Sequence, residues 1–289
     1  MAAPLSIAAV RRLSRPAFPA AGFAFWVVSG LILLVAAGPL VAPHDPYQAD
    51  FLNRLAGPSA TYPLGTDAMG RCLLSRLLHG AQLTTLSALS VVATAAAIGI
   101  LVGAVSGYFG GLPDRLLMRL TEGVSVLPAL AIAIVIAGIL GLGLKAVILA
   151  LAAVHWTDYA RLVRNVVMVE RSKTYVMAAE ALGVRRLDVI RRHLLPNIAA
   201  PLLAMGTYSI SWVILSFAGL SFLGLGVEPG TPEWGRLIAE SRSHLREYPR
   251  LVMVPGFTIM AFVIAINLIG DATGDRLRHG RTNFLNPRS

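Results

Sequence analysis

The side chains that carry enzyme chemistry are few in this sequence and form no catalytic pattern. The 289 residues include six histidines, one cysteine and 15 acidic residues, and their positions indicate neither a metal-ligand cluster nor a nucleophile with its base. A phosphate-binding loop needs Gly-Lys followed by Ser or Thr, yet Lys145 follows a leucine and Lys173 follows a serine. We therefore expect no catalytic residue, metal site or cofactor in this chain, and any energy source must be another polypeptide.

The polar segment 170–197 has the composition of a short helix held between two longer elements. Tyr175 to Leu182 are mostly good helix formers, and Gly183 suits the left-handed position that ends a helix. Pro196 stands where the next long helix would begin, and proline is well tolerated in a first helical turn. The pattern predicts a helix with a small-residue surface, stiffly joined to its neighbours.

The elements that position this segment are predicted to be membrane helices. The chain is 56% hydrophobic and only 14% charged, whereas soluble domains usually carry about 25% charged residues. Because each span needs roughly 20 mainly apolar residues, and a helix satisfies its own backbone in lipid, six helical spans are expected. The apolar runs are Phe18–Val41, Leu83–Gly107, Val124–Leu144, Lys145–Met168, Ile198–Leu220 and Leu251–Leu268.

The basic residues favour one orientation of these spans. With both termini cytoplasmic, 17 of the 25 Lys and Arg residues fall in inner segments, as the positive-inside rule requires. The net charge of +10 is then explained by topology and not by nucleic-acid binding. The expected organisation is a cytoplasmic N-terminus at 1–17, a first span at 18–42, an external loop at 43–82, a core at 83–276 with the cytoplasmic element 170–197, and a cytoplasmic tail at 277–289.

Two other readings of the first and second spans stay open at this point. A basic N-terminus before an apolar run also resembles a secretory signal, but this run is longer than the roughly 7 to 15 residues of a signal core. In the second span Gly99, Gly103, Gly107 and Gly111 share one helical face, which lets another helix approach closely. We expect packing within the chain, with a subunit contact as the alternative.

Several polar residues have both a functional and a structural interpretation. Asp158, beside the end of the fourth span, is either a buried functional acid or an interfacial partner of Arg161 or Arg164. External charges either dock another protein or form a solvated face: Arg236, Glu240, Arg242, Arg246 and Glu247. Residues of the fifth span are candidates for pore lining, with core packing as the alternative: Met205, Tyr208, Ser211 and Trp212.

The segment Tyr175-Val-Met-Ala-Ala-Glu-Ala-Leu-Gly183, followed by His193-Leu-Leu-Pro-Asn197, resembles the EAA loop of ABC importer permeases. That loop has Glu-Ala-Ala, three residues, Gly, nine residues, Ile, one residue and Leu-Pro. Met177 stands at the glutamate position and His193 at the isoleucine position, and such a histidine is usual in the peptide-importing branch. The resemblance implies that these residues couple to an ATPase: Tyr175, Ala178, Ala179, Ala181, Leu182, Gly183, Leu195 and Pro196.

The external stretch from Tyr62 to Ala81 resembles a signature of one permease subunit, the C-type subunit, in dipeptide, oligopeptide and nickel importers. The matching residues are Gly65, Thr66, Asp67, Gly70, Arg71, Ser75 and Arg76. Cys72 replaces the aspartate that is usual in that family. Further matches, from Gly107-Tyr-Phe-Gly-Gly to Asn267-Leu-Ile-Gly-Asp271, extend the resemblance over most of the chain from Pro63 to Arg276.

The resemblance implies a fold, a mechanism and a set of partners. The fold is all-α and integral to the bacterial inner membrane, a type I importer permease similar to MetI, with six spans and a cytoplasmic coupling helix. The partners are a homologous second permease, two ATPase domains that bind ATP and Mg²⁺, and an extracytoplasmic binding protein. The chain then forms half of a pathway for di- or oligopeptides, with nickel or another small solute as the alternative cargo.

Two rivals from other classes remain. A secondary transporter or channel that works without ATP predicts buried ionisable residues in several spans and internal inverted repeats, neither of which we find in the sequence. A membrane scaffold that transports nothing has no need of the cytoplasmic helix with its glycine stop. Isolation of the protein without any ATPase would count against the importer reading.

Overall fold

The structure, a computed structural model, describes residues 20–285, and within them the regular secondary structure is helical, apart from one isolated bridge between Thr66 and Cys72. The expected cytoplasmic segment 1–17 lies outside the described residues. The α-helices are α2 (Ala20–Ala37), α3 (Leu73–Phe109), α4 (Gly111–Val126), α5 (Ala129–Leu140), α6 (Leu144–Arg171), α7 (Thr174–Ala181), α8 (Arg186–Val189), α9 (Leu195–Phe222), α10 (Trp234–Ser241) and α11 (Arg250–Leu285). Short 3-10 or π turns occupy Gly38–Leu40, Phe51–Asn53, Ile190–Leu194 and Arg242–His244.

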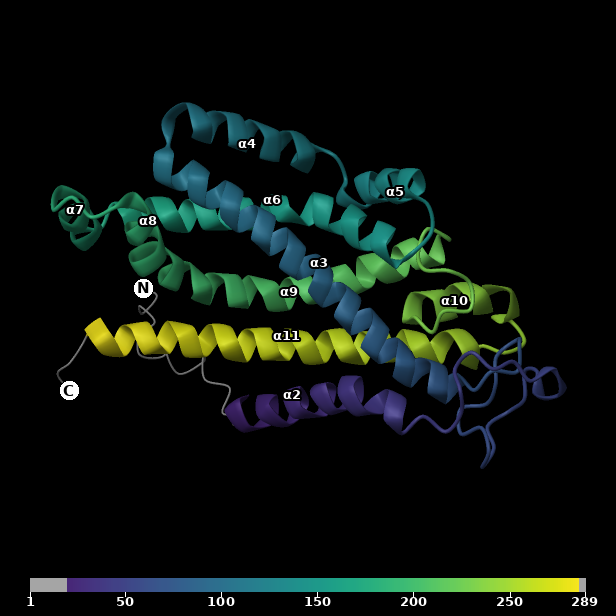
Figure 1. Ribbon diagram of the computed structural model, residues 1–289. Coiled ribbons are helices and arrows are strands. Elements are labelled where there is room, and N and C mark those ends of the chain that lie inside the picture. Colours follow the sequence, from purple (N-terminus) through teal and green to yellow (C-terminus); the bar gives the residue numbers. More distant parts are fainter. Residues whose placement is uncertain (1–19, 286–289) are drawn as a thin grey trace, which may run out of the picture.

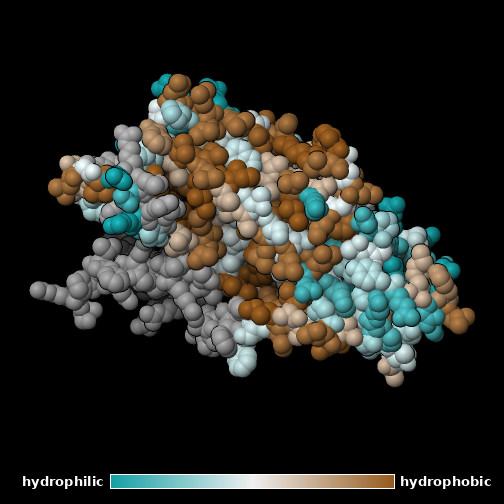
Figure 2. All heavy atoms as spheres, in the orientation of Figure 1, coloured by the Kyte–Doolittle hydropathy of each residue, from teal (hydrophilic) through white to brown (hydrophobic). Residues whose placement is uncertain are grey.

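Within the part of the chain that the structure describes, four helices are long and apolar enough to cross a membrane: α3, α6, residues Pro196–Phe222 of α9 and residues Arg250–Gly270 of α11. The bent pair α4 and α5 counts as a fifth span if it is taken as one. In the first expected span, the described part has a shorter apolar stretch at Ser29–Leu40. Figure 2 shows brown, hydrophobic side chains across the middle of the molecule and teal, hydrophilic ones around the end that carries α10.

The expected third span, Val124–Leu144, is wrong as a single helix. The chain breaks between α4 and α5, which meet at 89°. Pro128 has no N–H and excludes the helical conformation at the residue before it, and Leu127 is accordingly extended (φ −86°, ψ 146°). Hydropathy missed the break because Leu127 and Pro128 interrupt no apolar run. The segment between the second and third expected spans is also mostly helix, since α4 begins at Gly111.

The glycine face of α3 packs within the chain, as expected for three of its four members. A Cβ built on Gly103 would lie 2.4 Å from the carbonyl oxygen of Ala160 on α6, and Gly99 and Gly107 meet the same helix at 2.3 and 2.8 Å. No side chain fits at these distances, so α3 and α6 are joined backbone to backbone. Gly111 is the first residue of α4, after the end of α3, and has open space around it.

The helices place the loops at two opposite ends of the molecule (Figure 1). One end carries α7 and α8, and the other carries α10 and the segment between α2 and α3. α3 begins at Leu73, earlier than the span expected from Leu83, and therefore includes Ser75 and Arg76. The largest buried apolar cluster lies toward the α10 end, around Leu73, Trp234 and Phe262, and a smaller cluster supports α7.

Candidate functional site

α7 is the short helix that the sequence predicts, and it ends as predicted. Gly183 has φ +78°, and the N–H of Val184 donates to the carbonyl of Ala179 at 3.1 Å, which is the closing bond of a glycine-terminated helix. No atom lies within 4 Å of a Cβ built on Gly183. The glycine is therefore required by the backbone conformation and not by close packing.

The surface of α7 is almost entirely open. Tyr175 and Met177 are 44% and 51% exposed, Ala178 and Ala181 are exposed, and Ala179 is half-buried. Leu182, just after the helix, is 84% exposed. Val176 is fully buried, in the cluster with Val163, Val167, Val189, Leu194, Ile198 and Tyr108. α7 thus presents small and apolar side chains outward and packs on the protein through the buried side chain of Val176.

A hydrogen-bond chain joins α7 to the two long helices on either side of it. Glu170, at the end of α6, is 3% exposed and pairs with Lys173 at 2.6 Å. The Tyr175 hydroxyl donates to Glu170 at 2.8 Å, and Asn197, in the first turn of α9, donates to the same hydroxyl at 3.3 Å. Pro196 lies in that first turn, as predicted. Glu170 was not among the expected site residues; a lone acid five residues before a tyrosine is a weak signal.

The external signature folds into a compact turn before α3. Gly65 and Gly70 have positive φ, and a Cβ on Gly70 would overlap the carbonyl of Asp50 at 1.7 Å. Thr66 accepts from the backbone of Ala56 at 2.9 Å and donates to Asn53. Ser75 is buried and accepts the His44 N–H at 3.0 Å. These glycines and hydrogen bonds fix the conformation of the loop.

The charged members of the signature meet α10 in one cluster. Arg76 is 1% exposed and its Nη1 lies 2.6 Å from Asp67 and 3.0 Å from Glu240. Arg71 contacts the same two carboxylates at 2.8 and 3.0 Å, and Arg236 approaches Glu240 at 3.2 Å. Burial raises the pKa of Glu240, but the Arg76 and Arg71 charges and the Gly230 N–H leave that pKa below its usual value. We call Asp67, Arg71, Arg76, Arg236 and Glu240 the external charge cluster.

The five external charges considered above as a docking surface fall into two groups. Arg236 and Glu240 are engaged within the protein, whereas Arg242, Arg246 and Glu247 are exposed. Docking through the latter three stays a prediction. The partnership of Arg76 with Glu240 spans 164 residues of sequence, and no local pattern indicates it.

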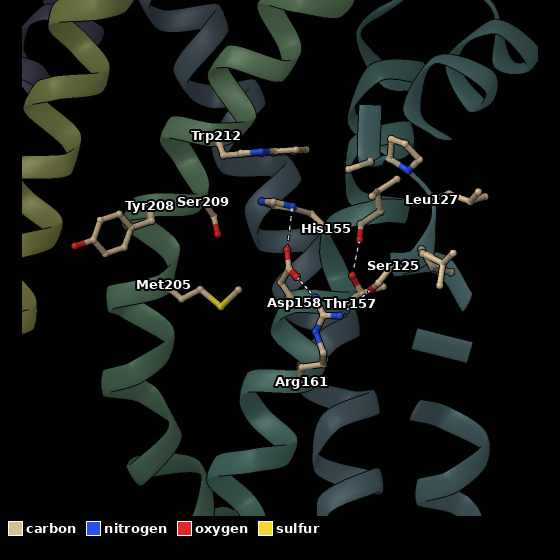
Figure 3. A pocket seen from close by; sticks show the side chains of 15 residues that line it. Ser125, Leu127, His155, Thr157, Asp158, Arg161, Met205, Tyr208, Ser209 and Trp212 are labelled. Atoms are coloured by element: carbon tan, nitrogen blue, oxygen red, sulfur yellow. Dashed lines mark hydrogen bonds and ion pairs between the residues drawn. The ribbon is translucent and has the colours of Figure 1, made fainter. Parts of the chain in front are cut away.

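A cavity of about 700 Å³ lies between the α4–α5 break, α6 and α9. Figure 3 shows its polar wall, formed by His155, Asp158 and Arg161 of α6 with Ser125 of α4. Three of the four pore-lining candidates, Met205, Tyr208 and Trp212, lie on the α9 wall. Ser211 does not line the cavity: it is 5% exposed and hydrogen-bonds Asn267 of α11 at 2.9 Å.

Asp158 lies near the midpoint of the helix α6, and where the span ends within that helix stays a prediction. The helix continues to Arg171, because Arg161 and Arg164 are paired and do not terminate it. Asp158 pairs with Arg161 at 2.5 Å, as expected. Arg164 instead holds Asp114 at the start of α4 through two bonds of 2.5 and 2.6 Å.

Comparison with known proteins places the chain in a family. Residues 99–281 match the family of binding-protein-dependent transport system inner membrane components. The di/tripeptide transport system permease protein DppC of Pseudomonas aeruginosa is 42% identical over 253 residues, covering 86% of this chain and 84% of the relative. The nickel transport system permease protein NikC of Escherichia coli is 34% identical over 259 residues, covering 87% and 94%.

The fold also matches a solved structure, the MetNI methionine ABC transporter in inward-facing conformations. The TM-score is 0.57 with 19% identity, covering 69% of this chain and 95% of that chain. At that identity the likeness concerns the fold alone, and it confirms the expected all-α fold of an importer permease. The chain belongs to the binding-protein-dependent transport system inner membrane components, and it is a multi-pass membrane permease subunit of an ABC importer.

Proposed function

We propose that this permease carries di- or oligopeptides inward as half of a pathway shared with a homologous permease. Two ATPase domains bind ATP and Mg²⁺ on the cytoplasmic side, and an extracytoplasmic binding protein delivers the cargo. Both termini are cytoplasmic in this proposal. The distribution of 17 of the 25 basic residues toward the inner segments supports that orientation.

One observation carries the proposal: α7 is joined to the two helices that line the cavity. Glu170 ends α6, Asn197 begins α9, and Tyr175 of α7 hydrogen-bonds both. α6 and α9 in turn supply Asp158 and Tyr208 to the cavity wall. A push on α7 by an ATPase is therefore passed directly to the helices that shape the pathway.

The exposed face of α7 suits a docking helix. Its small side chains, Ala178 and Ala181, and the apolar Leu182 are exposed at one end of the molecule (Figure 1). A cleft on the ATPase surface accepts such a helix without steric conflict, and burial of the apolar surface favours binding. Since the sequence has no phosphate-binding loop, the energy for transport comes from that partner.

Peptide is the proposed cargo because the di/tripeptide permease of Pseudomonas aeruginosa is 42% identical over most of the chain. The nickel permease of Escherichia coli is a second relative with similar coverage, so nickel is the competing cargo. Within residues 20–270, whose side chains are largely described, no group of three or more His, Cys, Asp or Glu residues is arranged to hold a metal ion.

Uptake by the complete transporter tests the proposal. The permease is purified with its partner permease, ATPases and binding protein, and placed in proteoliposomes with ATP or ADP inside. We expect ATP-dependent accumulation of radiolabelled L-alanyl-L-alanine and none of ⁶³Ni²⁺. Accumulation of nickel alone would replace the cargo, and accumulation with ADP driven by an ion gradient would favour a secondary transporter.

A further inference from the structure

An ion pair lies in the wall of the cavity. Asp158 and Arg161 stand near the middle of α6, which extends from Leu144 to Arg171, about 42 Å at 1.5 Å per residue. Ionisable side chains within a spanning helix are rare, and they mark functional sites when they face a cavity. These two line the cavity and remain 41% and 46% exposed to it.

The two charges neutralise each other, but both side chains remain partly exposed. Arg161 Nη2 lies 2.5 Å from Asp158 Oδ1, and Arg161 Nη1 donates to Ser125 Oγ at 3.0 Å. The guanidinium carries five N–H donors in a planar fork that matches a carboxylate. The pair is therefore stable in an empty cavity, and each member keeps a side open to a ligand.

An aromatic wall adjoins the pair. The His155 ring is stacked on Trp212, with centroids 4.3 Å apart and an interplanar angle of 16°. His155 Nδ1 lies 3.7 Å from Asp158, and among the described residues its Nε2 has no hydrogen-bond partner although it is buried. Met205 and Tyr208 add apolar surface opposite (Figure 3). The cavity thus combines one anion, one cation, an unsatisfied ring nitrogen and apolar walls.

We propose that this cavity binds both charged ends of a zwitterionic short peptide, with Arg161 holding the terminal carboxylate and Asp158 the terminal ammonium. This inference rests on the proposed peptide function. Asp158 and Arg161 exchange their pairing with each other for pairing with the two charged ends of the ligand, so both charges stay paired before and after binding. The volume, about 700 Å³, falls within the roughly 300–1,000 Å³ of small-molecule sites.

Exchange of partners also affects the hydrogen bond between α6 and the end of α4. Arg161 holds Ser125 just before the break at Leu127 and Pro128. A ligand carboxylate that binds the Arg161 guanidinium competes with Ser125 for the same N–H donors. In this proposal the charge of the cargo is linked to the bend between α4 and α5, which borders the cavity.

Equilibrium binding to the permease complex in nanodiscs, without the binding protein, tests the inference. The probes are radiolabelled L-alanyl-L-alanine, its C-terminal amide and its N-acetyl form. We expect Arg161→Gln to weaken binding of the free dipeptide at least tenfold and to change binding of the amide less than twofold. Asp158→Asn shows the converse pattern, a large loss for the free dipeptide and little change for the N-acetyl form. Arg115→Gln, an exposed arginine of α4 outside the cavity, leaves all three unchanged.

The outcomes separate this inference from the proposed function. Equal losses for all three probes in both variants mean that the pair only braces α6 against α4, which overturns the inference while peptide uptake stands. No binding by the wild-type complex overturns it as well. If Arg161→Gln does not assemble, Arg161→Lys and Asp158→Asn carry the same comparison. A transporter that takes up nickel and no peptide refutes the cargo itself.

Discussion

The end of the molecule that carries α10 and the end that carries α7 are held in different ways. At the first, two carboxylates and three guanidinium groups are paired, and Arg76 is 1% exposed. At the second, α7 rests on Val176 and on the hydrogen bonds of Tyr175. The α10 end is held to the bundle by several ion pairs. α7, in contrast, is exposed and is attached by few contacts. In the proposed orientation, the firmly packed end is external, and the exposed helix α7 is on the cytoplasmic side, where an ATPase can bind it.

Removing Arg76 breaks the external charge cluster and has the largest expected effect on stability. Arg76→Met leaves the buried Asp67 and the partly buried Glu240 with less charge compensation, which costs about 3–5 kcal/mol in the free energy of unfolding. Denaturant unfolding in detergent measures the loss. Arg242→Met, an exposed residue at the same end, serves as control and changes the free energy by less than about 0.5 kcal/mol. Equal stability of the two variants would show that the cluster does not hold this end.

Val176→Ala tests the single apolar anchor of α7. The substitution removes two buried methyl groups, or about 2 kcal/mol at roughly 0.8 kcal/mol per group plus a cavity term. We expect faster hydrogen exchange in α7 and α8 and unchanged exchange in α10. Met177→Ala, at the exposed neighbour, is the matched control. Uniform acceleration across both ends would contradict a local anchor.

The contrast between the ends also shows what a sequence can predict. The glycine spacing on α3 predicts close packing against another helix, because Gly99, Gly103 and Gly107 lie on one face of α3. In the structure that helix is α6. Gly183 and Pro196 predict the limits of α7 and α9 for the same local reason. The bend at Pro128 was missed because apolar composition outweighed a local backbone constraint. The Arg76 to Glu240 pair and the cavity around Asp158 depend on tertiary contacts between distant segments, which no local pattern contains.

Tyr175→Phe tests the hydrogen-bond chain with a smaller expected effect. The variant loses the bonds to Glu170 and Asn197, about 1 kcal/mol, while Lys173 still pairs with Glu170. We expect fewer peptides carried per ATP hydrolysed, with an unfolding temperature within a few degrees of wild type. Tyr47→Phe, at an exposed tyrosine of the opposite end, leaves the ratio unchanged. An unaltered ratio in Tyr175→Phe would remove the chain from the coupling route.

Met177→Glu has the smallest expected effect. Met177 is 51% exposed on α7, so a carboxylate there remains solvated and leaves the helix intact. We expect ATPase association to be unchanged or modestly tighter, measured by copurification of the ATPases with the permease. Loss of the ATPases from this variant would contradict the alignment of α7 with the EAA loop.

The central claim is that α7 transmits the ATPase stroke to the cavity, and a pair of glycine variants tests it most directly. Gly183 and Gly224 both follow a helix with positive φ, and neither has an atom within 4 Å of a built Cβ. They differ in place, since Gly183 follows α7 and Gly224 follows α9 at the opposite end. ATP hydrolysis and peptide uptake are measured together in the same proteoliposomes. We predict that Gly183→Asp abolishes uptake while membrane insertion is retained, and that Gly224→Asp retains most uptake. Wild-type uptake by Gly183→Asp, or equal loss in both variants, would contradict the account.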